Sequence, residues 1–513
     1  METPRADGPT GERMTGTGWP KELRPAARRV ALVTLIVVLG VGLALLPLKW
    51  AAVLLAGSSA VVVLLIRPAA GLCLLPFAVP FGSLREVALG PVRIGGAELL
   101  IAALLAAWLA QGVARRRIRY SPVGSSPPGA NGVPHLPLFF PLALFLGVLL
   151  LSVLPASSLE LSAKEIVKWV EVAVVYGLVA EALDERTGRW VVWAMLGAAS
   201  VEAGVGIYQF LNRIGPEGFV LFGRFMRAYG HFAQPNPFAG YLGLSIPLAY
   251  ALTLDSLPSL WLALRRPSLR SLPLLLPALS LVVMGLAVGM SWSRGAWVGL
   301  AAALLVVTVL RSRRALLVAG VAGVIAAYVL AAGGARYLPP SLVQRAADLL
   351  PFAGGVDVAT VEVNDANWAV LERMAHWMAA ADMFTDHPWL GVGIGNYPVA
   401  YPQYAIGRWR DPLGHAHNYY LNIAAEAGLL GLSTFLVLIA ACFRFGLRAT
   451  RRASGPTWWR AVALGSLGVL VHLCVHNLFD NLFVHSMNVQ LGLVLGLAVL
   501  AERFGTGQNV ERA

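Results

Sequence analysis

Two histidines stand directly before a long apolar segment of the chain, in the order His415-Ala-His417-Asn418. An imidazole titrates near neutral pH, so it can remove the proton of a hydroxyl group as that hydroxyl attacks another molecule. At about 100° per residue, Gly428 and Gly431 share a helical stripe with His417. Because small residues let a neighbouring helix approach closely in lipid, we expect these glycines to set packing beneath the histidine. A polar first helical turn without chemistry is the alternative.

Arginines in two other segments could hold an anion. Arg294 lies between two long apolar segments that are joined by almost no loop, so it stays near the membrane interface. A charge at that depth is costly unless its side chain reaches water or meets an anion, which makes Arg294 a candidate functional residue. Arg224 and Arg227 precede a turn that Asn236 and its flanking prolines force before a helix near residue 238. The alternative for this pair is contact with lipid headgroups.

These segments resemble motifs of the O-antigen ligase and O-antigen polymerase family of membrane glycosyltransferases. The segment from His417 follows the pattern H-N-x9-G-x-x-G, and the segment around Arg294 follows S-x-S-R-G-x-W. The turn at Asn236 is similar to the family's N-P-N-x-F-A-G-Y, with Gln in place of the first Asn. Arg227 best occupies the arginine position that precedes this motif, and Arg224 is a close rival.

Two further segments are similar to those of the family. Residues 388–397 follow P-x-x-G-x-G-x-x-x-Y, end at Tyr397 and lie a little after Arg373, and we expect them to shape a lid over the site. The family often has a His and an Asp where His476 and Asp480 stand, at the last turn between apolar segments. Polar residues at this turn could line a glycan path or satisfy helix ends.

The resemblance implies an enzyme that transfers glycans linked to undecaprenyl pyrophosphate onto lipid A core, protein or another glycan. It favours His417 as the catalytic base, because that histidine is followed by the Asn and the glycine spacing, and it leaves His415 and Asn418 as supporting residues. Two guanidiniums such as those of Arg227 and Arg294 can stabilise the charge that develops on a leaving pyrophosphate without a metal. Direct attack of this kind inverts the anomeric configuration.

We expect neither a cofactor nor a metal ion in this site. The loops predicted to face outward contain no Asp-x-Asp element, and Glu372 with His376 offers too few ligands for a metal. Ligase and polymerase share the donor chemistry and differ in the acceptor, so the sequence leaves both open. A membrane transporter is a less favoured alternative, because the hydropathy shows no internal repeat.

The composition indicates an all-α, polytopic integral membrane protein. Of 513 residues, 57% are hydrophobic and only 13% are charged, and the mean hydropathy is +0.68. We expect about 12–14 transmembrane helices and one large extracytoplasmic loop domain. The apolar segments lie near residues 30–47, 50–66, 69–83, 95–113, 136–154, 164–183, 189–211, 238–254, 272–290, 293–310, 314–332, 418–443, 459–478 and 485–502.

The net charge of +13 is distributed over alternate loops, which argues against nucleic-acid binding and for a role in orienting the helices. The positive-inside rule then places both termini in the cytoplasm and the His417, Arg227 and Arg294 segments on the extracytoplasmic face of the cytoplasmic (inner) membrane. No nucleotide sugar is available on that face, so the donor must arrive activated in the membrane, as a polyprenyl pyrophosphate sugar does.

This topology predicts five parts of the chain. They are a disordered cytoplasmic tail at 1–29, about 11 transmembrane helices over 30–332, an extracytoplasmic helical cap at 333–417, about 3 transmembrane helices over 418–503, and a cytoplasmic tail at 504–513. The expected partners are a membrane-borne glycan donor, an acceptor that is a glycan, a lipid or a protein, and the membrane lipids themselves.

Overall fold

The computed structural model describes most of the chain from residue 66 onward. The described residues are 66–82, 87–89, 92–119, 136–265, 272–333, 358, 360–364, 367–453 and 458–505, with short runs or single residues between 33 and 64 and between 336 and 340. The predicted tail at 1–29, residues 506–513 and most of 334–366 lie outside them. The chain divides into Met1–Val63 and Leu64–Ala513, and every feature below belongs to the second unit.

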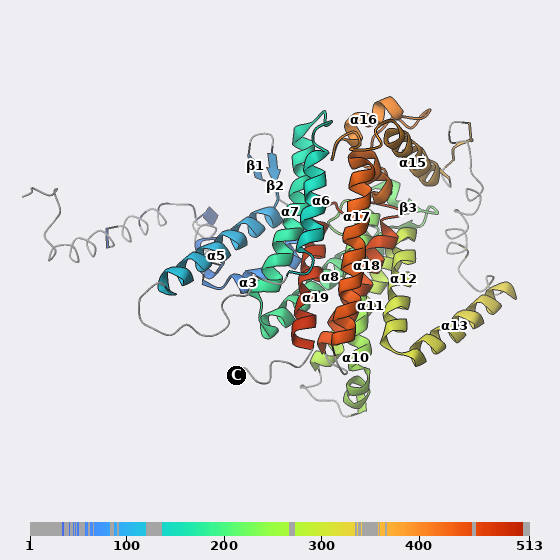
Figure 1. Cartoon of the computed structure of the whole chain (residues 1–513). Helices are drawn as coiled ribbons and strands as arrows, with labels where there is room; N and C mark the ends of the chain where they lie inside the picture. Colours follow the sequence, from blue (N-terminus) through green and yellow to red (C-terminus); the bar gives the residue numbers. More distant parts are fainter. Residues whose placement is uncertain are drawn as a thin grey trace, which may run out of the picture. The chain divides into compact units, whose positions relative to one another are not determined.

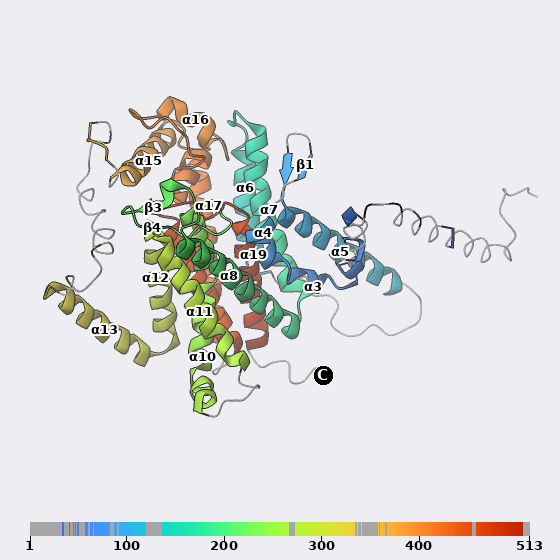
Figure 2. The same ribbon diagram turned by 180° about the vertical axis from the view of Figure 1, so that it is seen from behind.

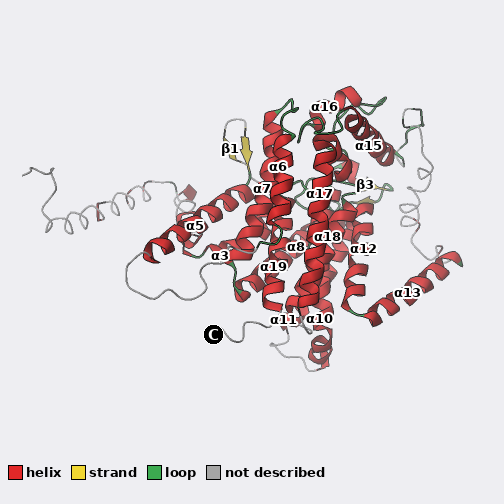
Figure 3. Ribbon diagram, viewed as in Figure 1, coloured by secondary structure: helices red, strands yellow, loops and turns green. Residues whose placement is uncertain are grey.

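Helices make up nearly all of the described part of this second unit, and two short antiparallel hairpins are added to them there (Figures 1 and 3). The hairpins pair β1 (Val87–Leu89) with β2 (Val92–Ile94), and β3 (Val220–Leu221) with β4 (Phe225–Met226). The helices are α3 (Pro68–Leu72), α4 (Leu75–Phe81), α5 (Gly96–Arg119), α6 (Phe139–Leu151), α7 (Leu159–Ala182), α8 (Glu185–Asn212), α9 (Pro235–Gly243), α10 (Ile246–Arg265), α11 (Leu272–Ser291), α12 (Arg294–Arg311), α13 (Arg313–Ala331), α15 (Trp368–Asp386), α16 (Tyr397–Tyr404), α17 (Tyr419–Arg452), α18 (Trp458–His476) and α19 (Met487–Gly505).

The prediction of an all-α polytopic membrane protein is confirmed. Eight candidate membrane spans occur among the described residues, and these eight include α8, α12, α17, α18 and α19. The segment expected as a span near 69–83 forms α3 and α4 instead, interrupted at residues 73–74, because prolines begin or interrupt both helices. The segments expected at 30–47 and 50–66 lie largely outside the described residues, so the total of 12–14 stays a prediction.

Helix α18 lies at the centre of the bundle, packed against α10, α12, α17 and α19. Glycines of α9 and α12 make this packing close at the histidines of α18. A Cβ atom added at Gly243 would lie 2.0 Å from Nε2 of His472, and one at Gly299 would lie 2.8 Å from its Nδ1. The ring of His472 therefore fills space that only glycine leaves open, which lets α9 and α12 pack closely against the last turns of α18. On the opposite side of the bundle α8 packs against α11 (Figure 2).

Helix α17 is broken at Gly428, where φ is +64°. The break leaves backbone groups without helical partners, and residues 388–393 supply them. The N–H of Val392 donates to the carbonyl of Ala425 at 2.9 Å, and the N–H of Leu429 donates to the carbonyl of Pro388 at 2.7 Å. The expectation that Gly428 and Gly431 share a stripe of one continuous helix with His417 is therefore wrong, because the helical rotation stops at residue 428.

Residues 367–417, here called the cap, lie over one end of the bundle, at the top in Figure 1. Its first helix, α15, buries Leu371, Ala375 and Ala379 completely. The shorter α16 follows a series of turns, and Tyr397 and Tyr401 pack from it against α15. The cap thus rests on the first part of α17, next to the break at Gly428.

Candidate active site

A cavity of about 350 Å³ opens where the cap meets the starts of α9 and α12 and the end of α18. Segments far apart in the sequence contribute its walls, so the fold gathers most of the residues that the motifs singled out. The lining residues are Arg227, Gln234, Asn236, Ser293, Arg294, Gly295, Val298, Ala369, Val370, Glu372, Arg373, Met374, Trp377, Leu413, His415, His417, His476, Phe479 and Asp480.

Arg227 is fixed in this wall by two hydrogen bonds. Its Nε donates to the carbonyl oxygen of Ser291 at 2.7 Å, and its Nη2 donates to Oδ1 of Asn236 at 3.0 Å. The N–H of the next residue, Ala228, donates to the carbonyl of Met290 at 3.0 Å. These contacts attach the loop before α9 to the turn between α11 and α12, so Arg227 and Arg294 reach the same cavity.

The N-termini of two helices, which carry the positive ends of the helix dipoles, are directed at the same wall of the cavity as Arg227 and Arg294. Helix α12 begins at Arg294, and the side chain of its N-cap residue Ser293 makes no capping hydrogen bond. Ser293, Arg294 and Gly295 all line the cavity. Helix α9 begins at Pro235, and Asn236 in its first turn also lines the cavity. Unsatisfied N–H groups and the helix dipole at such ends favour an anion, so this wall suits a phosphate group.

The short loop before α17 holds His417 in an unusual backbone conformation, with φ of +52°. Three hydrogen bonds from neighbouring residues keep it there. Oδ1 of Asn418 caps α17 by accepting from the N–H of Tyr420, and the N–H of Tyr419 donates to the carbonyl of Asn477 at 2.8 Å. The carbonyl of His417 itself accepts from Nε1 of Trp377 at 3.3 Å. Because Asn477 directly follows α18, this arrangement brings His417 next to Asp480.

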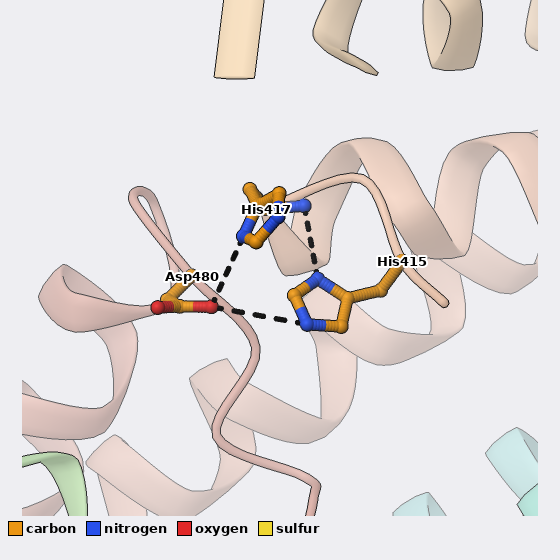
Figure 4. A group of neighbouring side chains, drawn as sticks. All are labelled: His415, His417 and Asp480. Carbon is orange, nitrogen blue, oxygen red and sulfur yellow. Dashed lines mark hydrogen bonds and ion pairs between the residues drawn. The ribbon is translucent and has the colours of Figure 1, made fainter. Parts of the chain in front are cut away.

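His415, His417 and Asp480 form one cluster (Figure 4). Nδ1 of His417 lies 3.4 Å from Oδ1 of Asp480, and Nε2 of His415 lies 3.9 Å from the same oxygen. The N–H of His417 donates to Nδ1 of His415 at 3.1 Å, so that nitrogen carries no proton. Burial, together with the neighbouring His417, lowers the pKa of His415 to about 3. His415 is therefore neutral, with its ring proton on Nε2.

Asp480 is ionised in this cluster. Its burial opposes ionisation, but the contact with His417, the neighbouring His415 and the charge of Arg373 outweigh it and hold the pKa of Asp480 well below its usual value. A carboxylate beside Nδ1 of His417 favours the tautomer that carries the proton on Nδ1. Nε2 of His417 is then the basic nitrogen, and it has no hydrogen-bond partner among the described residues.

The same three side chains have the donor types of a metal site, with one ligand atom each within 4.8 Å of the others. The tautomer of His415 disfavours such a site. A metal at Nε2 of His415 needs that nitrogen without a proton, whereas the hydrogen bond from His417 to Nδ1 keeps the proton on Nε2. A metal ligand set would therefore require this backbone hydrogen bond to break.

The other candidates divide into residues inside the cavity and residues that support it. Arg373 and His476 line the cavity. Arg224 lies in the turn of the β3–β4 hairpin, with its guanidinium 5.2 Å from the ring centre of Phe225, and it is not among the lining residues. Tyr397 is buried in the cap, where its hydroxyl lies 2.8 Å from Nδ1 of His376.

Sequence reasoning missed Trp377, which lines the cavity and holds the carbonyl of His417. A signal was present in the sequence, because Trp377 follows Arg373 by four residues and so shares its face of an α-helix. The apolar face of the same helix, which contains Leu371 and Ala375, is buried in the protein.

Comparison with known proteins agrees with the motifs. Residues 279–436 match the family model described as O-antigen ligase. This region contains Arg294, Arg373, Tyr397, His415 and His417. An O-antigen ligase of Pseudomonas aeruginosa is 28% identical over 219 residues, which are 42% of this chain and 45% of that protein. The chain thus aligns with about half the length of this relative. The resemblance expected from the motifs is confirmed: residues 279–436 of this polytopic helical membrane protein match the O-antigen ligase family model.

Proposed function

We propose that this protein is an O-antigen ligase-like glycosyltransferase. It moves a glycan from undecaprenyl pyrophosphate to an acceptor, which is lipid A core, protein or a cell-surface polymer, and it inverts the anomeric centre without a metal ion. The observation that carries the proposal is that Arg227 and Arg294 line the same cavity as the His417–Asp480 pair. The family match over Arg294 and His417 supports the same assignment.

The donor binds with its pyrophosphate against the wall of Arg227, Arg294 and the two helix N-termini. Charge-assisted hydrogen bonds from guanidiniums are among the strongest available to phosphate oxygens. Because Arg227 is already fixed by Ser291 and Asn236, little reorganisation is needed as negative charge develops on the leaving group.

The acceptor hydroxyl approaches Nε2 of His417. As its oxygen forms the new bond to the anomeric carbon, its proton passes to Nε2, and the bond from that carbon to the pyrophosphate oxygen breaks with its electron pair. Asp480 stabilises the imidazolium that results, through the contact at Nδ1. General base catalysis of this kind contributes typically about 10²–10⁴ in rate.

The orientation of the protein follows from the basic loops. We propose that both termini lie in the cytoplasm and that the cavity faces the extracytoplasmic side of the inner membrane, where the donor is delivered in lipid. The cap, as the extracytoplasmic domain predicted within 333–417, then covers the site from outside.

An O-antigen or exopolysaccharide polymerase uses the same donor chemistry with a glycan as acceptor and is the second candidate. A transporter is less well supported, because translocation does not require a histidine with an unpartnered ring nitrogen held beside a carboxylate and two arginines. Substrate flux from vesicles that survives loss of His417 is the result that a transporter predicts.

The test is glycan transfer by the purified protein, given an undecaprenyl pyrophosphate oligosaccharide and a panel of acceptors. Product that forms in EDTA, and is lost in folded Arg294→Ala and His417→Ala variants, supports the proposal, and the productive acceptor distinguishes ligase from polymerase. Transfer by the variants at the wild-type rate would refute the site assignment. Transfer that is lost in EDTA and restored by a divalent ion would refute the metal-free mechanism.

A further inference from the structure

The loop that carries Arg227 is anchored by two polar side chains of α8, a helix that contributes no residue to the cavity lining. Oε1 of Gln209 accepts from the N–H of Gly230 at 2.7 Å, and its Nε2 donates to the carbonyl of the same residue at 3.0 Å. Oε1 of Glu202 accepts from the N–H of His231 at 2.6 Å, and Oε2 lies 2.8 Å from Nδ1 of that histidine. Because Glu202 and Gln209 are seven residues apart, they share one face of α8 and hold consecutive residues of the loop.

Two glycines allow this close contact. Gly230 has a φ of +56°, and a Cβ atom there would lie 1.9 Å from Oε1 of Glu202. On α8, a Cβ atom at Gly206 would lie 2.3 Å from the ring of Phe238, which follows the loop in α9. The loop and α9 therefore pack on one face of α8 at distances that larger residues at these two positions would prevent.

Glu202 is completely buried, in a helix that is one of the candidate membrane spans. A buried carboxylate is costly unless hydrogen bonds compensate for the lost water. Among the described residues, both of its oxygens find their partners on His231 alone. The ring of Phe81 packs edge-to-face on that imidazole, with 5.2 Å between the ring centres. Displacement of the loop would leave the carboxylate without partners, so Glu202 strongly favours the docked position.

We propose that Glu202 and Gln209 are positioning residues for the donor site, which hold residues 228–231 so that Arg227 meets the donor pyrophosphate. This inference rests on the proposed function and deepens it, because it assigns part of donor recognition to a helix outside the cavity.

The anchor reaches Arg227 through a short path. Only residues 228 and 229 separate Arg227 from Gly230. The N–H of Ala228 donates to the carbonyl of Met290 at 3.0 Å, and Nε of Arg227 donates to the carbonyl of Ser291. The loop is thus fixed between α8 and the end of α11. A guanidinium that is already in place stabilises developing charge with little reorganisation, whereas a displacement of about 1 Å can cost about 10²-fold in rate.

A double-mutant cycle tests whether the anchor acts through Arg227. The dissociation constant of the glycan-linked undecaprenyl pyrophosphate is measured in nanodiscs for Glu202→Leu, Arg227→Ala and the double variant, together with steady-state transfer. We expect each single variant to weaken donor binding about 10- to 100-fold, and the double variant to bind no more weakly than Arg227→Ala. The KM for the acceptor should stay unchanged. Glu202→Gln, which keeps an oxygen for the N–H of His231, should recover part of the loss.

Glu171→Leu is the matched control, since Glu171 is another buried glutamate whose hydrogen bond goes to Asn488 of α19, at 2.8 Å, instead of to the loop. Any weakening of donor binding that it causes should be the same with and without Arg227, because it does not act on that arginine. Gln209→Leu provides the same test at a half-buried position of the anchor, for the case that Glu202→Leu does not fold.

Independent effects would overturn the inference. If the double variant binds the donor more weakly than Arg227→Ala by the full factor seen for Glu202→Leu, Glu202 supports only the fold. Wild-type donor binding by folded Glu202→Leu, or by folded Gln209→Leu, refutes the role of that residue and leaves the proposed function standing. If wild type itself neither binds the donor nor transfers glycan, the proposed function fails, and this inference fails with it.

Discussion

The backbone N–H of His417 donates a hydrogen bond to Nδ1 of His415, with 3.1 Å between the nitrogen atoms. This contact makes the two imidazoles unequal. His415 uses one ring nitrogen to hold the loop and directs its protonated Nε2 toward Asp480. His417 faces the same carboxylate with Nδ1, and its Nε2 has no partner among the described residues. Only His417 is therefore arranged to take a proton from a substrate.

The first prediction compares the same substitution at the two positions. His417→Asn should lower kcat by about 10²–10⁴, because the general base is lost. His415→Asn should keep most of the activity, since the amide oxygen of Asn can accept the N–H of residue 417 in place of Nδ1. The measurement is steady-state transfer by both purified variants. A larger loss of kcat in His415→Asn than in His417→Asn would show that His415, and not His417, is the general base.

The second prediction concerns the carboxylate that orients the base. Asp480→Asn keeps the shape of the side chain but can present an N–H to Nδ1 of His417, which would move the ring proton to Nε2 and block proton acceptance. We expect a loss of kcat of about 10²–10⁴ with little change in donor affinity. Donor binding by the variant and its transfer rate, measured side by side, separate this effect from misfolding. A variant with normal kcat would show that Asp480 is not needed.

The sequence predicted most of the residues that meet in the cavity because their motifs are local. A tight turn must leave Arg294 at the end of two helices, and prolines must place Asn236 at the start of another. Helix positions followed equally well from the lengths of the apolar segments, as the match between the expected segments and α8, α12 and α18 indicates. In these cases a few neighbouring residues determine the geometry.

Contacts between distant segments could not be derived in the same way. The stripe argument for Gly428 assumed an unbroken helix, whereas residues 388–393 stabilise a break there by supplying hydrogen bonds from outside α17. The role of Trp377 likewise depends on the docking of the cap against the loop of His417. No local pattern encodes such a pairing, which only tertiary structure creates.

The third prediction tests that break. A Cβ atom at Gly428 would lie 2.3 Å from the carbonyl carbon of Trp389, and its φ of +64° is unfavourable for any other residue. Gly428→Ala should therefore displace residues 388–393, destabilise the cap by more than the about 1–3 kcal/mol typical of backbone strain, and lower activity. Hydrogen exchange of the α15 and α16 amides is the measurement, and it should show lost protection.

Gly285→Ala is the matched control for this substitution. Gly285 lies in α11, and nothing lies within 4 Å of a Cβ atom placed there. We expect the control to keep wild-type protection and activity, because Ala fits an open helical position without strain. Equal loss in both variants, or normal protection in Gly428→Ala, would contradict the role of the break in docking the cap.

The last prediction is a pH dependence of the cap. His376 is buried, its ring is stacked on Tyr401 with 4.5 Å between the ring centres, and burial followed by the nearby His417 lowers its pKa from 6.5 to about 4. The unfolded cap therefore binds a proton that the folded cap excludes, so stability is full above about pH 6.5 and falls as the pH is lowered toward 4. His415, with its pKa lowered to about 3, acts in the same direction.

His376→Asn should remove about half of this dependence of cap stability on pH, because one of the two titrating histidines is lost. His387→Asn, at an exposed position of the cap, should leave the pH dependence unchanged. The measurement is the opening of the cap by hydrogen exchange in both variants, corrected for the intrinsic exchange rate at each pH. If the pH dependence of opening is unchanged in His376→Asn, this histidine is already protonated in the folded cap.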